Sequence, residues 1–473
     1  MAETAADLRA WAQSLRDGPR LGAAVTALAD WASSDPWSCA SENARGALRN
    51  AITNLLAVTA GAAAMPEQQA FLDAWDPEPG AAVVIGTGRS VPVEAAAWIN
   101  GVNAVFFERD EGNRYAKGHP AVQTAPAILA VAERLGISGE PLWNALYVGY
   151  ELATRFGRAT AFHPDVHTHG TFGVPGAAAG CALLLGGDRD AVARAIEAAV
   201  ALPPATDWAT VLDGSALRDQ WVGAGLVAGL AAARYGIAGL PVGRDGGTIR
   251  FGGRLGEIAP AVLVDDLGGE GLVTRSYLKQ YSSCAYTHSS ADAAILLRAE
   301  LAERGLGADD VLGIEAEVTG LAAALDDRTW DSRPAAYFSV PFAVASALLY
   351  GDVRIDRAAV PAEPALTALA QRVTVIAADG TIPSPIPNAR PARLTLRLSD
   401  GSTLVTTVAH PKGDALDTPF SREHFETILA EALAPAGLGA VAAHHAVAGL
   451  ERSEPGAAHV ALLGLAAAGA GID

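Results

Sequence analysis

Cysteine is scarce in this chain: the three residues Cys39, Cys181 and Cys284 stand far apart, with no CxxC pair. This spacing excludes a disulfide framework and supplies no zinc ligand set, and it is typical of a reducing compartment. Long hydrophobic runs are also missing, because the stretch from Thr171 to Leu185 contains glycine and proline and is too short to span a bilayer. A Walker loop, a GxGxxG motif and a GxSxG elbow are absent as well, so the sequence offers none of these nucleotide-binding or hydrolase motifs.

Basic residues are outnumbered, with 34 Lys and Arg against 52 Asp and Glu and a net charge of -18. An acidic surface argues against nucleic acid and anionic membranes as partners. The first residues, MAETAADLRAWAQSL, have an acidic amphipathic pattern that differs from a signal peptide. We therefore expect a cytoplasmic protein in which an anionic substrate requires a locally positive pocket.

The apolar pattern predicts a mainly α protein of two or three domains, because 473 residues exceed one compact core. Helical periods cover 4–34, 41–63, 94–107, 121–136, 139–159, 188–202 and 214–235, and the segments 66–93 and 243–258 are interpreted as loop with a short hairpin in the first. Strand patterns follow at 312–321, 371–379 and 392–411, with helices at 289–304 and 337–350 and a last helix capped by Ser421. We predict a large all-helical domain (1–265 plus 410–473) with an inserted smaller α+β domain (266–409).

The most unusual stretch is FFERDEGNRYAKGHPAVQTAPA, which runs from Phe106 to Ala127 between two apolar helices. It contains the charged or hydrogen-bonding candidates Asp110, Asn113, Lys117 and His119. One interpretation is an exposed charged loop between helices. The other is a functional site, because charges buried between apolar helices are costly unless they pair or meet a ligand.

Histidines concentrate in a second stretch, FHPDVHTHGTFGVPGAAAG, which holds His163, His167 and His169. The H-x3-H-x-H spacing is compatible with a metal, but no paired carboxylate motif accompanies it, and we predict no metal. The small residues that follow predict a tightly packed central helix. Further on, Arg218 stands at the head of an apolar helix, where the alternatives are a solvated first-turn side chain and a buried anion-binding group.

A third cluster, KQYSSCAYTHSSADAAILL, brings Lys279, Cys284 and His288 to the start of a helix. Free backbone N–H groups at such a start can hold a carboxylate, and the alternative is a simple capped helix. Nothing in the sequence forces a low pKa on Cys284 as a nucleophile. Taken together, the three clusters and Arg218 supply histidines that titrate near neutral pH and cations that bind carboxylates, which suits cofactor-free proton abstraction beside a carboxylate.

Five segments in this order resemble the MmgE/PrpD family, which includes 2-methylcitrate dehydratase, cis-aconitate decarboxylase and iminodisuccinate epimerase. The similarity covers roughly residues 40–430 and rests on AAAWINGVNAVFFERDEGNRYAKGHP, GYELATRFGRA, HTHGTFGVPGAAAG, KQYSSCAYTHSSADAA and YFSVPFAVASALLYGD. The resemblance implies a homodimer of all-helical domains with α+β lids. It also implies a cofactor-independent lyase or isomerase that takes a proton beside a carboxylate of a small di- or tricarboxylic acid, with dehydration or epimerisation as the type of reaction.

Carried onto this sequence, the family pattern gives a catalytic set and a substrate-binding set. The catalytic candidates are Asp110, His119, His167 and His288, and the substrate-binding candidates are Asn113, Lys117, His169, Arg218, Lys279 and Cys284. The chain departs from the family pattern where DEGN replaces a DFDD-type loop, Arg218 replaces a lysine and Phe342 replaces a tyrosine that could donate a proton. These departures leave one alternative open, a non-catalytic member that binds a metabolite or serves as a structural dimer.

Overall fold

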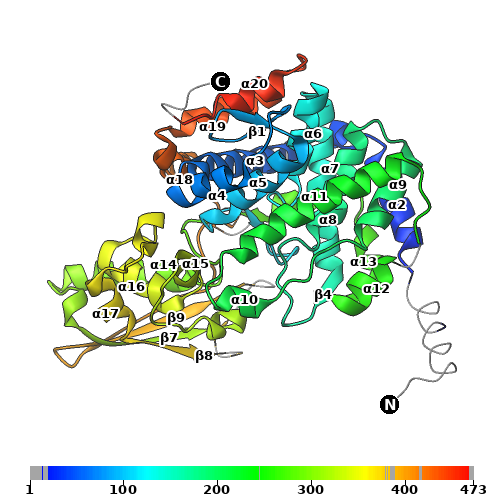
Figure 1. Cartoon of the computed structure of the whole chain (residues 1–473). Coiled ribbons are helices and arrows are strands. Elements are labelled where there is room, and N and C mark those ends of the chain that lie inside the picture. The colour runs from blue at the N-terminus through cyan, green and yellow to red at the C-terminus, as the bar shows by residue number, and fades with distance from the viewer. Residues whose placement is uncertain are drawn as a thin grey trace.

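The computed structural model describes residue 13 and residues 20–243, 246–378, 380, 382–383, 389–414 and 418–467. Most of the acidic helix predicted at the start of the chain, and the end of the chain after 467, lie outside the described residues. The protein is mainly α-helical, as the apolar period predicts, with a small mixed sheet at one end (Figure 1).

The largest hydrophobic core of the described residues is built mainly from helices, with a few buried residues from short strands. Its main helices are α2 (Gly22–Ala32), α3 (Glu42–Ala63), α4 (Pro66–Trp75), α5 (Val93–Phe106), α6 (Ala125–Leu135), α7 (Glu140–Ala159), α8 (Gly173–Leu184), α9 (Arg189–Ala199) and α11 (Leu217–Ile237), joined by α18 (Arg422–Leu433), α19 (Ala440–Leu450) and α20 (Ala457–Leu463). Helix α11 packs on α5, α8 and α9, and α7 packs along α8.

Small residues bring α7 and α8 unusually close together, as the glycine- and alanine-rich pattern predicts. A Cβ at Gly176 would lie 2.3 Å from the carbonyl oxygen of Gly149, so only glycine fits there. Both helices are buried over nearly their whole length. They form a rigid floor for the loops at their ends, which carry the histidines and the charged stretch.

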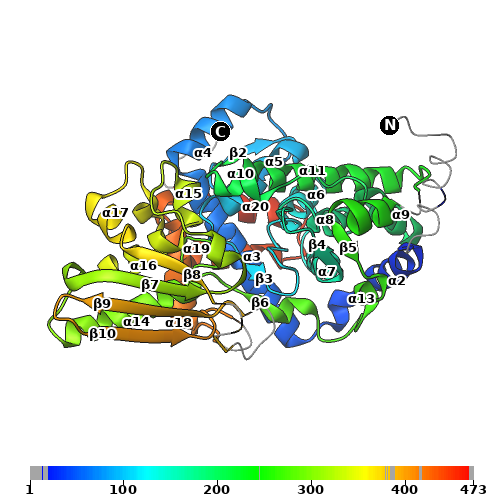
Figure 2. The ribbon, with the colours of Figure 1, turned by 90° about the horizontal axis from the view of Figure 1, so that it is seen from below.

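The second core lies between a four-stranded sheet and helices α14 (His288–Glu303), α16 (Val340–Tyr350) and α17 (Pro364–Ala370). The strands β7 (Val311–Val318), β8 (Val373–Ala377), β9 (Ala392–Leu398) and β10 (Thr403–Val408) are ordered β10-β9-β7-β8, and only β7 and β8 run parallel (Figure 2). Alternate residues of β9 are buried, which is the period of two that predicts this strand. Helix α14 covers β9 and β10, and α16 covers β8. The division of the chain at 266 and 409 stays a prediction.

Two short ladders set the geometry where the cores meet. Strand β3 (Gly112–Asn113) pairs with β6 (Ser276–Tyr277), which ties the charged stretch to the segment before Lys279. Strand β4 (Thr160–Phe162) pairs with β5 (Gly256–Ile258). A third ladder, β1 (Ala82–Val84) with β2 (Arg89–Val91), is the hairpin predicted within 66–93.

Two local predictions are wrong. The segment after Pro66 forms α4 because proline suits a first helical turn, and 243–258 contains the short helix α12 (Gly246–Ile249) and a π-helical turn (Arg250–Arg254). Helix α7 ends at Ala159, as the predicted range 139–159 has it. The lysine Lys117 satisfies carbonyls at this helix end, with its Nζ 2.9 Å from the oxygen of Gly157 and 2.8 Å from that of Thr160.

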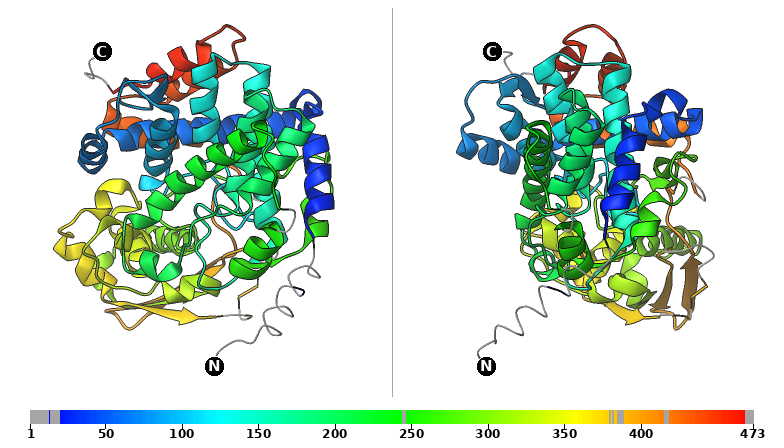
Figure 3. Two further views of the ribbon diagram at one scale, coloured as in Figure 1. Left: turned by 45° about the vertical axis from the view of Figure 1, so that its right-hand side comes forward. Right: turned by 90° about the vertical axis from the view of Figure 1, so that its right-hand side faces the viewer.

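The chain returns to the larger core after β10, where Ser421 caps α18 as predicted and accepts a hydrogen bond from the backbone N–H of His424 (3.1 Å). Helices α18 and α19 pack on α3, and α20 packs on α6 (Figure 3). Within the described ranges, no single helix is long and apolar enough to cross a membrane. The segments Arg422–Ala436 and Ala440–Leu450 reach that length and composition only as a pair bent by 98°.

Candidate functional site

The charged stretch that follows α5 turns inward. Glu108, Arg109, Asp110 and Glu111 are each no more than 2% exposed, which rules out the interpretation as an exposed loop. Glu108 adopts a left-handed φ of 49°, a conformation that costs energy for a residue with a side chain. The turn directs its carboxylate toward α11 and the segment after β6.

Two buried cations meet the two carboxylates of this turn. Lys279 Nζ lies 2.8 Å from Glu108 Oε1 and 3.3 Å from Asp110 Oδ1. Arg218 pairs with Glu108 and with Asp219, whose Oδ1 is 2.8 Å from Arg218 Nε. Burial alone raises the pKa of Glu108 and Asp110, but the facing cations, together with His119 for Asp110, outweigh it and hold both pKa values well below their usual range.

These ion pairs decide between the alternatives for Arg218. Its side chain is buried rather than solvated, and its guanidinium is already matched by two carboxylates and by the carbonyl oxygen of Val105 at 3.0 Å. The same carboxylates raise the pKa of Arg218 against the effect of burial. Arg218 and Lys279 therefore fix the position of Glu108 and Asp110.

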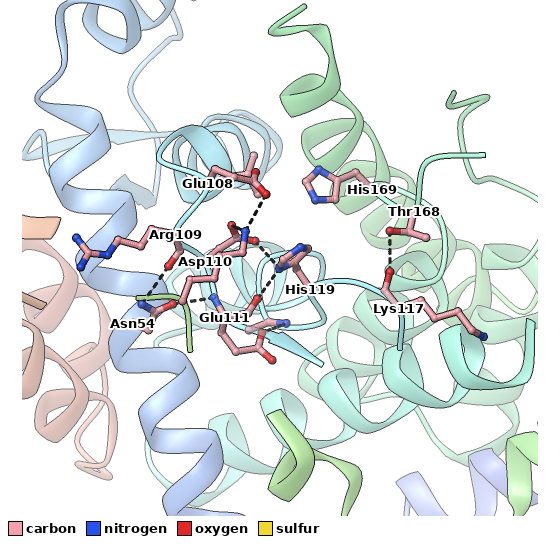
Figure 4. A network of polar contacts seen from close by, with 12 residues as sticks. Asn54, Glu108, Arg109, Asp110, Glu111, Lys117, His119, Thr168 and His169 are labelled. Carbon is pink, nitrogen blue, oxygen red and sulfur yellow. Dashed lines mark hydrogen bonds and ion pairs between the residues drawn. The ribbon is translucent and has the colours of Figure 1, made fainter. Parts of the chain in front are cut away.

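Glu111 differs from its neighbours because no cation pairs with it in the described part of the chain. The hydroxyl of Tyr150 donates to its Oε1 at 2.5 Å, and the backbone N–H of Ala121 donates to its Oε2 at 3.2 Å. Burial raises its pKa to about 8, so the carboxyl is mostly protonated at neutral pH. Asn54 of α3 binds the backbone on both sides of Asp110. The Glu111 N–H donates to its Oδ1 at 2.8 Å, and its Nδ2 donates to the carbonyl oxygen of Arg109 (Figure 4).

His119 is the histidine best placed for proton transfer. Its Nδ1 lies 2.8 Å from the carbonyl oxygen of Glu111 and 3.0 Å from Asp110 Oδ2 (Figure 4). Because a carbonyl oxygen only accepts, Nδ1 carries the proton and the neutral ring has its lone pair on Nε2. The pair with Asp110 fixes this tautomer and stabilises the ring once it is protonated.

His167 and His169 lie beside His119 at the end of the loop before α8. The His169 ring is 5.5 Å from that of His119 and 4.6 Å from that of His167, between centroids. The His169 N–H donates to His167 Nδ1 at 3.3 Å. Burial is the main cause that lowers the pKa of both rings well below the usual value, assisted by Arg218 near both rings and by His167 near His169, so both stay neutral at physiological pH.

A cavity of about 470 Å³ opens onto these histidines. It is lined from the larger core by Glu108, His119, His167, His169 and Arg218, and from the second core and its approach by Tyr277, Cys284, Tyr286, Phe338 and Arg390. Its volume lies in the range typical of pockets for small organic ligands. The larger core supplies the histidines, and both parts of the chain supply cations.

Comparison with known proteins agrees with the order of these segments. The MmgE/PrpD N-terminal domain model matches residues 26–233, and the MmgE/PrpD C-terminal domain model matches residues 281–435. The chain belongs to the MmgE/PrpD family. A curated relative, the cis-aconitate decarboxylase-like protein oryM of Aspergillus oryzae, is 26% identical over 382 residues, which cover 72% of this chain and 76% of the relative.

Besides Lys279, which pairs with Glu108 and Asp110, three of the residues carried over from the family pattern do not present a free polar group to the cavity. Asn113 accepts the N–H groups of Tyr115 and Ala116 and donates to the carbonyl oxygen of Leu272 at 2.9 Å. Lys117 lines the cavity, but its Nζ is engaged at the end of α7. We therefore assign Asn113 and Lys117 to holding the loop, and not to binding substrate as predicted.

His288, the third of these residues, is the predicted catalytic residue that does not join the others. Its Nε2 lies 3.1 Å from the carbonyl oxygen of Ser283, and burial, followed by Lys279, lowers its pKa to about 3. The residue lines a second, smaller cavity that shares Tyr277 and Arg390 with the first. Of the predicted acid–base set, the structure thus brings together Asp110, His119 and His167, and leaves His288 aside.

The structure also shows the surroundings of Cys284 and Phe342. Cys284 lines the cavity, but burial raises its pKa to about 11, so its thiol is neutral and a poor nucleophile. Phe342 packs edge-on against Trp330 at 5.1 Å, deep in the second core, and does not line the cavity. The aromatic residue of this region that does line it is Phe338.

Sequence reasoning missed Tyr277, Trp208 and Arg390, all of which line the cavity. Tyr277 lies two residues before Lys279 and could have been included with that cluster. Trp208 and Arg390 had no usable signal, because each stands in a segment without motif or period.

Asp110, His119 and His169 have potential metal-ligand atoms within 4.8 Å of one another. Two histidines and a carboxylate suit a divalent transition metal. However, Lys279 already pairs with Asp110, and Nδ1 of His119 is used by a carbonyl oxygen. A metal would have to bind next to two buried cations, and the expectation of a metal-free site stays a prediction.

Proposed function

We propose that this MmgE/PrpD protein is a cofactor-independent lyase or isomerase that removes a proton beside a carboxylate of a small di- or tricarboxylic acid. The observation that carries the proposal is the state of His119. Its Nδ1 is occupied by Asp110 and by the backbone of Glu111, which leaves Nε2 as the basic atom at the cavity. The family membership and the decarboxylase-like relative support a lyase-type reaction.

In the proposed mechanism, His119 Nε2 takes the proton from the carbon beside the carboxylate. The resulting imidazolium is stabilised by Asp110 at 3.0 Å. A cation that binds the substrate carboxylate stabilises the negative charge that develops on it as the C–H bond breaks. His167 and His169, both neutral, donate or accept hydrogen bonds to the substrate and carry no charge that would compete with that cation.

We further propose that the second core acts as a lid and that the protein works as a cytoplasmic homodimer. Residues of both cores line the cavity, so closure of one over the other would exclude water from the reacting carbon. Light scattering after size exclusion should give twice the mass of one chain, and a single-chain mass would contradict the dimer.

The test of the reaction is proton NMR in deuterium oxide with 2-methylcitrate, citrate, cis-aconitate, malate, aspartate and iminodisuccinate. Deuterium at a substrate carbon without loss of water or carbon dioxide identifies an epimerase or isomerase. An alkene product formed with loss of water identifies a dehydratase, and carbon dioxide release identifies a decarboxylase. A protein that binds one of these acids and never exchanges its protons would be a binding protein instead.

A further inference from the structure

Arg390 is the cation of the cavity that no protein carboxylate matches. Its guanidinium lies over the rings of Tyr286 and Tyr277, 4.5 Å and 5.3 Å from their centroids. No Asp or Glu of the described ranges lies within ion-pair distance of it, whereas Arg218 meets Glu108 and Asp219. A guanidinium stays charged at all physiological pH values, so Arg390 leaves a net positive charge at the cavity.

The other cations are poor candidates for binding an anion. Lys279 is fully buried between Glu108 and Asp110 and does not line the cavity. Lys117 lines it but donates to carbonyl oxygens of α7 and β4. A substrate carboxylate at Arg218 would be repelled by Glu108, which already pairs with Arg218. At Arg390 it would meet a positive charge that no carboxylate of the described residues balances.

The contacts around the cavity place the basic histidine between Arg390 and an aromatic wall. Tyr277 contacts both Arg390 and the His119 ring, the latter at 6.4 Å. On the other side of His119, its ring contacts His169, which contacts His167. The ring of Trp208 lies 4.5 Å from that of His167 and 6.3 Å from that of Phe338, between centroids. Trp208 and Phe338 both line the cavity with aromatic rings, and the guanidinium of Arg218 lies over the Phe338 ring, 5.1 Å from its centroid.

We propose that Arg390 binds the substrate carboxylate and that the substrate is an acid carrying an alkyl group, which packs against Trp208 and Phe338. The two tyrosine rings hold the guanidinium in place, and two of its N–H groups can donate to one carboxylate. The proposal rests on the proposed function in one respect, that the bound carbon next to the carboxylate lies at His119.

The test uses binding, measured by calorimetry, of succinate and of alkylsuccinates with methyl, butyl and hexyl chains. Arg390→Gln should weaken binding of all four about ten- to a hundredfold, the usual value of a hydrogen-bonded charge. The matched control is Arg275→Gln, because Arg275 also lies over a tyrosine (Tyr115, 4.9 Å) but is outside the cavity. Arg275→Gln should bind the acids as the wild type does.

The alkyl part is tested on the same series. Wild-type affinity should rise with chain length, by up to about fourfold for each buried methylene, and Trp208→Ala should flatten this rise. Circular dichroism should show that Arg390→Gln and Arg275→Gln are folded. Unchanged binding by a folded Arg390→Gln would overturn the proposal that Arg390 binds the carboxylate. Equal affinity for all four acids would overturn the alkyl-binding assignment.

These outcomes separate the inference from the proposed function. If alkylsuccinates bind through Arg390 but no acid exchanges protons in deuterium oxide, Arg390 binds the carboxylate as proposed and the proposed catalysis is wrong. If Arg390→Gln exchanges substrate protons with an unchanged KM, the proposed catalysis is supported and Arg390 does not bind the carboxylate.

Discussion

At the scale of single residues, the tautomer of His119 decides which of its nitrogens can act as the base in the proposed mechanism. The carbonyl oxygen of Glu111 keeps the proton on Nδ1, and Asp110 waits beside it to balance the charge that proton transfer creates. This arrangement leaves Nε2 as the basic nitrogen of a residue that lines the cavity, and the proposed mechanism requires no other histidine to change its charge.

Replacing His119 by glutamine should lower kcat by about 10²- to 10⁴-fold on whichever acid the NMR panel identifies, because it removes the proton acceptor. The thermal unfolding of His119→Gln should stay close to that of the wild type. His445→Gln, on the exposed side of α19, serves as the control and should keep full activity. Wild-type kcat in His119→Gln would show that another group is the base.

Glu111 makes stability depend on pH. Its pKa in the fold is about 8 against an ordinary value of 4.5, with burial as the main cause and with Tyr150, the Ala121 N–H, Asp110 and Lys279 as the groups that face it. Between these two values the unfolded chain releases a proton that the folded chain retains, so stability falls as the pH rises from about 4.5 to 8. The slope from this one group is at most about 1.4 kcal/mol per pH unit.

Glu111→Gln should therefore flatten the decline in unfolding free energy between pH 5 and 8, as measured by urea denaturation. The control is Glu303→Gln at the exposed end of α14, which should reproduce the wild-type slope. An identical slope in Glu111→Gln would mean that Glu111 is ionised in the folded protein.

At the scale of secondary-structure elements, the end of α7 supports the loop that carries His119. A Cβ at Gly157 would lie 2.4 Å from the carbonyl oxygen of Ala116 and 2.9 Å from its Cα. Because both contacts are backbone, the loop would have to shift as a unit.

Gly157→Ala should destabilise the protein by about 1–3 kcal/mol or more, as overpacking does, and should reduce activity through the displaced loop. The matched change Gly46→Ala in α3, where a Cβ meets nothing within 4 Å, should gain up to about 1 kcal/mol from helix propensity. Differential scanning fluorimetry of the two variants measures this contrast, and equal melting temperatures would contradict it.

The same elements show how far the sequence alone could lead. Helices α3, α5, α7 and α11 and strands β7, β9 and β10 follow directly from apolar periods of 3.6 and two. The burial of Asp110 was left open by the sequence, which also allowed an exposed charged loop, and the meeting of His119 with His169 is set by the tertiary structure. The contact of Lys117 with the carbonyl groups at the end of α7 could not be predicted, because it joins the helix to a distant loop. Nor could the sequence show that Arg218 is matched by carboxylates while Arg390 is not, because ion-pair partners are set by tertiary structure.

At the scale of the whole molecule, the cavity belongs to both cores. His119, His167 and His169 come from the larger core, and Cys284, Tyr286 and Phe338 come with the second. Binding of an acid in this cavity should therefore protect backbone amides on both sides of it.

Hydrogen exchange with and without a bound alkylsuccinate should show slower exchange in 115–119 and 166–169 and also in 284–286 and 337–339. The loop at the tip of the β9–β10 hairpin, around Asp400, serves as an internal control and should exchange at the same rate in both states. Protection of the histidine loops alone would contradict closure of the second core as a lid.

The buried ion pairs of Lys279 also restrict which domains of different relatives can be joined in one chain. Lys279 lies in the segment 234–280, which neither of the two family domain models covers, yet it balances Glu108 and Asp110 of the N-terminal part. A hybrid that joins the N-terminal domain of one relative to the C-terminal domain of another would keep its fold only if the connecting segment brought a cation to this position. A hybrid whose connecting segment lacks this cation would therefore have an uncompensated negative charge in its interior.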